Sequence, residues 1–368
     1  MKLHRPLYVG AVATWLPETV ETATEAVSSG RLAQDDVPVT GYRQLPVSHA
    51  CAPPDMAVLA AHRALAATGE DPGEVGLLVH AWTYHQGHDF WSPAHYIAHR
   101  TGALGALPVG VQQMCNGGAC GLELAAARLQ ADPSTGTAVV TTGDRFCAPG
   151  FDRWRGDYGL WYGDAGTAAV LHSAPPKSGH ALELLSLVTA ASPVMETMHR
   201  GRDPFSPAPR EHSDMIDIRR TKKAFLQDNG KEHFAKTVQQ RVPSVIRQAL
   251  HEAGVDLESG LRAVLLPRLG RTALEAAYLP AVAQVTDAPA LDVGHDTGHL
   301  GAGDMLANLA LLAGDGAGTG AGHELAPGET AVVLSAGGGF TWSCAVARRP
   351  RTRPTHIDTA DPSGRGGR

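Results

Sequence analysis

The sequence predicts a layered α/β fold made of two similar halves. Short β-rich runs alternate with Ala- and Leu-rich helical patterns along the 368 residues, and this is the rhythm of βαβ units. In each half a strand leads into a turn of small residues and then into a helix. The hydrophobic content of 43% allows a large core, and the length fits two domains or one duplicated domain.

The first half, residues 1–175, is expected to alternate strands with helices. Its helices carry apolar residues at helical spacing, as Leu122, Ala126 and Leu129 do. The expected strands cover residues 7–16, 75–84, 107–114 and 137–146, and the expected helices cover residues 53–69, 95–102 and 115–130.

The second half, residues 176–349, repeats the pattern, and the two halves are expected to join near residues 172–182. Residues 192–232 are rich in charge, Pro and Met, which favours an insertion or a lid. The tail, residues 350–368, is rich in Pro, Gly and charge and is predicted to be disordered. Helical patterns cover residues 242–254, 272–284 and 305–314, and β-like runs cover residues 262–270 and 330–349.

Composition excludes several classes of function. The net charge is −6, and no stripe of Lys and Arg with interleaved aromatic residues suggests nucleic-acid binding. No apolar run approaches the roughly 18 to 20 residues that a membrane-spanning helix needs. The N-terminal stretch has a strand-like alternation and no convincing cleavage site, so no leader peptide is expected. Five cysteines without a Cys-x-x-Cys pair fit a reduced, cytoplasmic protein.

Cys115 is the candidate nucleophile. It lies between a predicted strand and a predicted helix, where unpaired N–H groups and the positive end of the helix dipole favour a thiolate. The following Gly117 and Gly118 cost about 1 kcal/mol of helix stability each, which makes sense if something must approach the backbone closely. The alternative is a small buried residue at a tight turn. For Cys51, Cys120, Cys147 and Cys344 a packing role is the stronger interpretation.

The segment Val293–Leu306 contains the candidate partner of this thiolate. His295 and His299 have the spacing of two metal ligands on a helix, but the glycines between and after them make a stable helix doubtful. A polar loop without chemistry is the second interpretation. In the third, His299 is a general base for Cys115 and Asp304 orients it, as in other activated nucleophiles. The three consecutive glycines from Gly337 can offer free N–H groups to an oxyanion.

The order of these motifs resembles the ketoacyl synthase III group of the thiolase superfamily. "QQMCNGGACGLELA", "LWYGDAGTAAVL", "GHLGAGDMLANLALL" and "LSAGGGFTW" carry the resemblance, which extends to about residue 348. It implies a duplicated α-β-α-β-α fold of five layers, a homodimer, and acylation of Cys115 by a thioester donor. It also implies oxyanion N–H groups at Cys115 and Gly338. Phe90 stands where an aromatic side chain of the partner subunit closes the acyl pocket.

Three departures from that group bear on the reaction. Condensing members carry a histidine in an L-x-P-H motif, and here "LLPRLG" has Arg268. They carry an asparagine where this chain has His299, and a phenylalanine where it has Ala336. The His/Asn pair stabilises the enolate formed on decarboxylation, so condensation should be slow without it. Arg268 could bind the carboxylate of a malonyl-type chain, or it could be a structural arginine at a helix end.

Cys115, His299 and Asp304 resemble the triad of a non-condensing branch, of which the cervimycin malonyltransferase is typical. The resemblance implies an acyltransferase of polyketide and antibiotic biosynthesis that moves malonyl or another short acyl or aryl group through a Cys115 acyl-enzyme. The donor would be a CoA or acyl carrier protein thioester, without a permanently bound cofactor or metal. The acceptor would be a hydroxyl of a sugar or natural-product aglycone, or a carrier thiol. The alternatives are a condensing or starter-unit synthase, a non-enzymatic partner and a thioester hydrolase.

His80, His85 and His88 gather in "HAWTYHQGHDF". We interpret them as packing or surface groups rather than ligands. Neither the acyl chain nor the acceptor follows from the residues alone.

Overall fold

Ten strands form one sheet whose two halves have the same strand order. A computed structural model describes residues 1–175, 180–211, 213–230, 232–256, 260–314 and 322–351. The strands of this sheet run in the order β10-β9-β11-β12-β8-β1-β7-β6-β4-β5. Their bounds are β1 (Tyr8–Trp15), β4 (Val75–Ala81), β5 (Leu107–Val111), β6 (Thr137–Asp144), β7 (Ala165–His172), β8 (Leu182–Ala191), β9 (Val264–Leu265), β10 (Ala290–Leu291), β11 (Thr330–Gly337) and β12 (Thr341–Arg348). A separate pair consists of β2 (Val20–Thr22) and β3 (Gln44–Pro46).

The strand order confirms the predicted duplication. The order β5-β4-β6-β7-β1 of the first half matches β10-β9-β11-β12-β8 of the second, strand for strand. In both halves the first three strands of this order pair with one another in parallel, and each of the next two strands pairs antiparallel with the strand before it. The halves meet where Tyr8 and Val9 pair with Glu183 and Leu182. The boundary predicted at residue 175 adjoins residues 176–179, outside the described residues, so its position stays a prediction.

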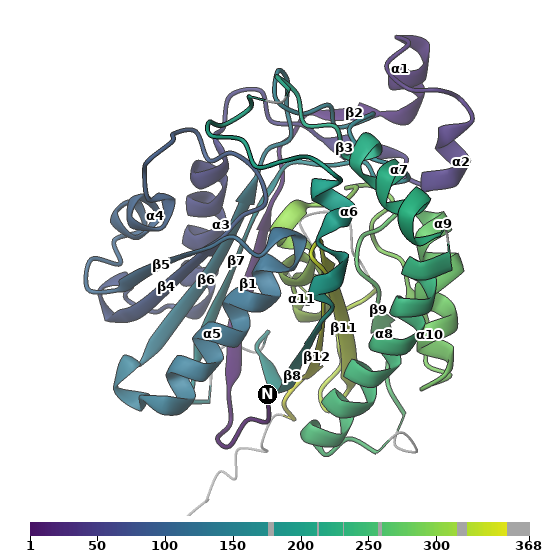
Figure 1. Cartoon of the computed structure of the whole chain (residues 1–368). Coiled ribbons are helices and arrows are strands. Elements are labelled where there is room, and N and C mark those ends of the chain that lie inside the picture. The colour runs from purple at the N-terminus through teal and green to yellow at the C-terminus, as the bar shows by residue number, and fades with distance from the viewer. Residues whose placement is uncertain (176–179, 212, 231, 257–259, 315–321, 352–368) are drawn as a thin grey trace, which may run out of the picture.

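The helices form three layers around the two half-sheets (Figure 1). The helices α3 and α4 cover the outer face of the first half-sheet, and α8 and α10 cover the outer face of the second. The helices α5 and α11 lie between the two half-sheets. This is the expected five-layered arrangement. The bounds of these helices are α3 (Pro53–Thr68), α4 (Pro93–Thr101), α5 (Gly117–Ala131), α8 (Glu232–Ala253), α10 (Leu279–Ala283) and α11 (Asp304–Ala313). The smaller helices are α1 (Ala23–Ser28), α2 (Asp36–Thr40), α6 (Thr197–Arg200), α7 (Ile218–Asn229) and α9 (Arg271–Ala273).

Strand periodicity explains why the central strands are apolar on both faces. Successive side chains of a strand point to opposite faces. Val140 of β6 packs in the central core with Leu122 of α5 and Leu306 of α11, whereas the neighbouring Val139 packs against the helix α3. A strand with helices on both faces therefore needs continuous apolar runs.

The glycines of α5 allow other segments to pack closely against its backbone, as the sequence analysis expected from the helix stability that glycine costs. A Cβ on Gly118 would lie 2.6 Å from the carbonyl oxygen of Ala302. A Cβ on Gly121 would lie 2.7 Å from a methyl group of Val140. The start of α5 therefore lies directly against the segment that carries His299.

The segment 192–232, predicted to be an insertion or a lid rather than core, contributes buried residues to the core of the second half. Residues 192–232 contain α6 and α7, and Phe225 of α7 is buried with the core of the second half. The predicted disordered tail falls largely on residues 352–368, which lie outside the described residues. Among the described helices, none is long and apolar enough to cross a membrane.

Candidate active site

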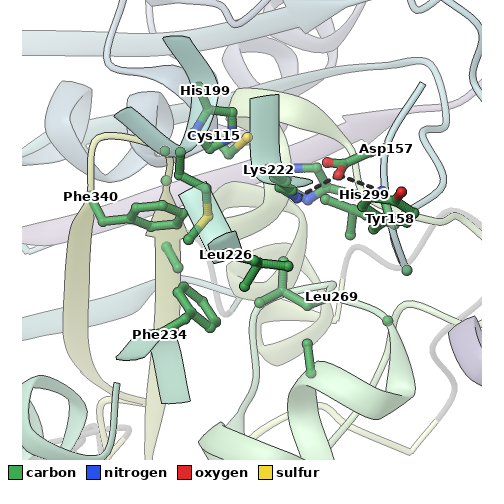
Figure 2. A pocket seen from close by; sticks show the side chains of 18 of the residues that line it. Cys115, Asp157, Tyr158, His199, Lys222, Leu226, Phe234, Leu269, His299 and Phe340 are labelled. Carbon is green, nitrogen blue, oxygen red and sulfur yellow. Dashed lines mark hydrogen bonds and ion pairs between the residues drawn. The ribbon is translucent and has the colours of Figure 1, made fainter. Parts of the chain in front are cut away.

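A cavity of about 680 Å³ brings together residues from both halves of the chain. Figure 2 shows its side chains, among them Cys115 and His299. The walls are mainly apolar and aromatic, which is usual for a site that takes a small-molecule group. The lining includes Cys115, Asp157, Tyr162, Met198, His199, Lys222, Lys223, Leu226, Phe234, Tyr278, His299, Ala336, Gly337, Gly338 and Phe340.

Cys115 lies where the sequence predicted, between β5 and α5. It sits in a single 3₁₀ turn, Met114–Asn116, immediately before the first residue of α5. Met114 holds this turn with a φ of 48°. The neighbouring Asn116 is buried and donates a 2.9 Å hydrogen bond to Ser343 of β12. The turn is thus anchored to the second half, and its half-buried thiol faces the cavity.

His299 and Asp304 form a buried hydrogen-bonded pair. The Nδ1–H of His299 donates to Oδ2 of Asp304 over 2.7 Å, and both side chains are almost fully buried. Asp304 also accepts the N–H groups of Leu300 at 2.9 Å and Arg268 at 3.1 Å. These bonds fix the carboxylate, which fixes the ring and leaves Nε2 as its free nitrogen. Among the described residues that buried Nε2 has no hydrogen-bond partner of good geometry, although the Cys115 side chain lies near enough for a hydrogen bond that helps to raise the pKa of His299.

The charge of its neighbours determines the protonation of His299. Burial lowers the pKa of His299, but the carboxylate of Asp304 and the thiolate of Cys115 outweigh burial and raise this pKa well above its ordinary value. Cys115 and His299 line the same cavity. The arrangement therefore favours a protonated His299 between Asp304 and Cys115.

The backbone of His299 is hydrogen-bonded through both its N–H and its carbonyl to the segment around Tyr162. The His299 N–H donates to the carbonyl of Trp161 at 2.9 Å, and the Gly163 N–H donates to the carbonyl of His299 at 3.0 Å. The ring of Tyr162 packs edge-on against the imidazole, with centroids 5.2 Å apart. Tyr162 is itself held by a 2.8 Å hydrogen bond from its hydroxyl to Asp157.

Asp144 is a positioning residue that the sequence analysis missed. Its carboxylate accepts the N–H groups of Thr83 and Tyr84, both at 2.8 Å, and that of Ala302 at 2.9 Å. Burial raises the pKa of Asp144 to about 7, against the opposing effect of these donors and of the positive charge of His299. An acidic residue that ends a buried strand, as in "TAVVTTGDRF", was the available signal.

The glycine-rich turn packs against the nucleophile turn. A Cβ on Gly337 would lie 2.4 Å from the backbone nitrogen of Asn116. Gly338 lies beyond the β11–β12 ladder, whose last pair joins Gly337 to Thr341, and it lines the cavity. This placement is compatible with an oxyanion donor at Gly338. The assignment of that role, and of a second donor at Cys115, stays a prediction.

Arg268 does not lie where a carboxylate-binding role requires. It is absent from the described lining of the cavity. Its guanidinium donates to the side chains of Asn308 at 2.9 Å and Thr297 at 2.6 Å, and to the carbonyl of Val293 at 3.2 Å. The geometry therefore favours the structural alternative: Arg268 ties the histidine segment to α11.

The remaining histidines have other partners. His80 is buried, with Thr141 and Gln86 each 3.0 Å from one of its ring nitrogens, so the packing interpretation is confirmed. His295 lies 3.3 Å from Asp292, whereas His299 turns to Asp304. Among the described residues no group of three or more His, Cys, Asp or Glu side chains could hold a metal ion.

The other cysteines divide into buried and half-buried thiols. Burial raises the pKa values of Cys51, Cys120 and Cys344. None of these three, nor Cys147, is among the described lining of the cavity.

Sequence reasoning also missed His199, which α6 places in the cavity. A Cβ on Gly338 would lie 2.6 Å from its ring. No motif marked "METMHR", because its position depends on how residues 192–232 fold back onto the second half.

Phe90, by contrast, does not line the cavity of its own chain. Its side chain is fully exposed in the loop between β4 and α4, with a φ of 53°. The structure describes a single chain, so the expected place of Phe90 in the pocket of a partner subunit stays a prediction.

The chain is similar to solved structures over nearly its whole length. ChlB3, described as an acyltransferase, is 31% identical, with a TM-score of 0.82 over 94% of this chain and 98% of that chain. No protein-family model matches the sequence. No curated protein matches it either.

More distant structures share the fold. The 3-oxoacyl-(acyl carrier protein) synthase III of Pseudomonas aeruginosa PAO1 is 22% identical, with a TM-score of 0.70 over 95% of this chain and all (100%) of that chain. The priming β-ketosynthase of the R1128 polyketide pathway is 19% identical, with a TM-score of 0.72 over 96% of this chain and 99% of that chain.

Proposed function

Because this chain belongs to the ketoacyl synthase III-like acyltransferases of the thiolase superfamily, we propose that it transfers an acyl group through Cys115 without forming a carbon–carbon bond. The observation that carries the proposal is the buried His299–Asp304 pair beside Cys115. A histidine oriented by a carboxylate moves protons to and from oxygen and sulfur. An amide at the same place could not.

In the first half-reaction the thiolate of Cys115 attacks the carbonyl carbon of a thioester. A carbon–sulfur bond forms to Cys115, and the bond to the donor sulfur breaks. The departing thiolate takes the proton of the His299 imidazolium. Since the new thioester on Cys115 is neutral, the charge that helped to raise the pKa of His299 is gone, and the ring stays neutral.

In the second half-reaction neutral His299 takes the proton of an acceptor hydroxyl or thiol as that group attacks the acyl-enzyme. The bond to Cys115 breaks, and the thiolate and imidazolium are restored. Each half-reaction thus prepares the protonation state that the next requires. The N–H groups of Gly338 and Cys115 would stabilise the tetrahedral oxyanion in both.

The surroundings argue against decarboxylative condensation. The position of the condensing histidine holds Arg268, whose guanidinium is bound to Asn308 and Thr297 outside the cavity. No asparagine is among the described residues that line the cavity. An enolate would therefore lack the paired donors that the condensing relatives supply.

Three further features belong to the proposal. The donor is a CoA or acyl carrier protein thioester, and the acceptor is a sugar or natural-product hydroxyl or a carrier thiol. The active form is a homodimer in which the exposed Phe90 side chain reaches the pocket of the partner subunit. No permanently bound cofactor takes part.

Intact-protein mass spectrometry after incubation with acyl-CoA and acyl-pantetheine thioesters tests the proposal. We expect one acyl adduct on Cys115, none in C115A, and an undiminished adduct in the control C120A. A malonyl donor should release no CO2 above the background of C115A. An adduct that persists in C115A, no adduct with any donor, or CO2 release coupled to a condensed product would overturn the proposal.

A further inference from the structure

His199 is a polar group in the wall of the cavity that the proposed half-reactions leave unused. It comes from α6, in the segment between β8 and α8. Its Nδ1 is buried and has no hydrogen-bond partner among the described residues. A buried nitrogen without a partner costs folding free energy, and a ligand that hydrogen-bonds to it removes that cost.

The His199 ring packs against the glycine-rich turn at Gly338. A Cβ on Gly338 would lie 2.6 Å from Cε1 and 2.8 Å from Nδ1 of His199, so only a glycine leaves room for the ring. Gly337 packs in turn against Asn116, the residue after the nucleophile. Figure 2 shows the His199 and Cys115 side chains on the same side of the cavity. We therefore expect an acyl group on Cys115 to lie near His199.

Beyond His199 the cavity becomes apolar. The ring of Phe340 has its centroid 5.5 Å from that of His199 and 5.4 Å from that of Phe234. Met198 and Leu226 complete this part of the lining. The alkyl or aromatic part of an acyl chain fits this apolar region. A polar group far from the acyl carbonyl would find fewer hydrogen-bond partners there than one next to His199.

His199 is uncharged at neutral pH. Burial and the positive charge of Lys222 lower the pKa of His199 to about 4, against a smaller opposing effect of Asp157. Lys222 is itself paired with Asp157 at 2.5 Å. Apart from His299, which is paired with Asp304, the described lining near Cys115 therefore offers a neutral imidazole rather than a free cation, and Lys223 is exposed.

We propose that His199 selects the acyl group, by hydrogen-bonding an uncharged polar group such as a hydroxyl at the α or β carbon of the chain bound to Cys115. This inference rests on the proposed acyl transfer and names its substrate class: an otherwise apolar acyl thioester with a neutral polar group near the carbonyl. A free carboxylate, as in a malonyl chain, is a poorer match because the nearby cation is already paired.

The test is single-turnover acylation of Cys115, followed by intact mass. The donors are pantetheine thioesters of butyrate, 2-hydroxybutyrate, 3-hydroxybutyrate and malonate. We expect the wild-type protein to react with the better hydroxylated donor at least about tenfold faster than with the butyryl donor. H199L should bring that ratio close to one. H199N places an amide nitrogen near the position of Nδ1, and it should retain the preference although asparagine and leucine are similar in size.

Each outcome has a separate meaning. An equal preference in wild type and H199L, no preference in wild type, or fastest reaction with the malonyl donor would overturn the role of His199 and leave acyl transfer standing. If no donor acylates Cys115 in any of the proteins, acyl transfer itself fails. Thermal melts of H199L and H199N show whether a lost preference comes from unfolding, and the pair is compared at equal folded concentration.

Discussion

At the scale of single residues, the central feature of the proposed reaction is a change in the charge of His299 when Cys115 is acylated. Asp304 and Cys115 both raise the pKa of His299; in the proposed reaction the effect of Asp304 persists, whereas that of Cys115 ends when its sulfur is acylated. This difference allows one imidazole to donate a proton to the leaving thiol and then to accept one from the acceptor. A structural histidine such as His80, whose burial lowers its pKa to about 4, could not donate a proton at neutral pH.

Replacing the carboxylate of Asp304 by an amide should separate orientation from chemistry. D304N loses the acceptor of the His299 Nδ1–H, so the ring can adopt the wrong tautomer. We expect acyl transfer to slow by about 10²- to 10⁴-fold, as for the equivalent change in a Ser-His-Asp hydrolase.

The measurement is the steady-state rate with a fixed donor and acceptor. D296N is the matched control, because Asp296 lies in the same segment but pairs with Arg43 at 2.7 Å on the surface. A D304N rate within a factor of about three of wild type, with D304N still folded, would show that Asp304 does not orient His299.

Sequence patterns marked Cys115, His299 and Asp304 as candidates because each lies in a short motif that fits a nucleophile, a base or a carboxylate that orients the base. The same patterns could not identify His199 or Asp144. Their roles come from contacts with Gly338 and Ala302, which are distant in sequence. The sequence could not show where the guanidinium of Arg268 points, because its direction depends on the positions of Asn308 and Thr297.

At the scale of elements, periodicity predicted the helices and the long strands well. The strand expected over 7–16 is β1 at Tyr8–Trp15, and the helix expected over 53–69 is α3 at Pro53–Thr68. The strand predicted over 262–270 was too long, because only Val264–Leu265 pair as β9. The apolar residues around them signal burial, while the length of a strand depends on its neighbours β10 and β11.

The helix pattern at 272–284 is interrupted in the structure. A π-helical segment, Leu274–Tyr278, separates α9 from α10. Tyr278 at its end lines the cavity and accepts a 3.1 Å hydrogen bond from Trp342. Apolar spacing alone does not distinguish such a segment from a regular helix.

At the scale of the whole molecule, the duplication explains how the site is assembled. In each half a central helix follows the edge strand, α5 after β5 and α11 after β10. Cys115 precedes the first residue of α5, and Asp304 is the first residue of α11. The equivalent ends of two equivalent helices therefore supply the nucleophile turn and the carboxylate. Internal repetition was visible in the sequence, but the meeting of these two ends was not.

Mixed dimers test the proposed role of Phe90 in the partner's pocket. C115A should be inactive, and F90A should be at least about tenfold slower than wild type. Refolding or co-expressing the two at equal amounts makes about half of the dimers mixed, each with one complete site, so about a quarter of wild-type activity should return. An activity no higher than the mean of the parents, with a dimer confirmed by light scattering, would place Phe90 outside the partner's site.

The most direct test of the Cys115–His299 pair is the rate at which iodoacetamide alkylates Cys115, followed by peptide mass spectrometry across pH. At about pH 6.5, H299Q should be alkylated at least about tenfold more slowly than wild type, because the imidazolium no longer stabilises the thiolate. The difference should shrink as pH rises through the raised pKa of His299, and H295Q should match wild type throughout. Equal rates in H299Q and wild type at every pH would show that this histidine does not act on the thiol.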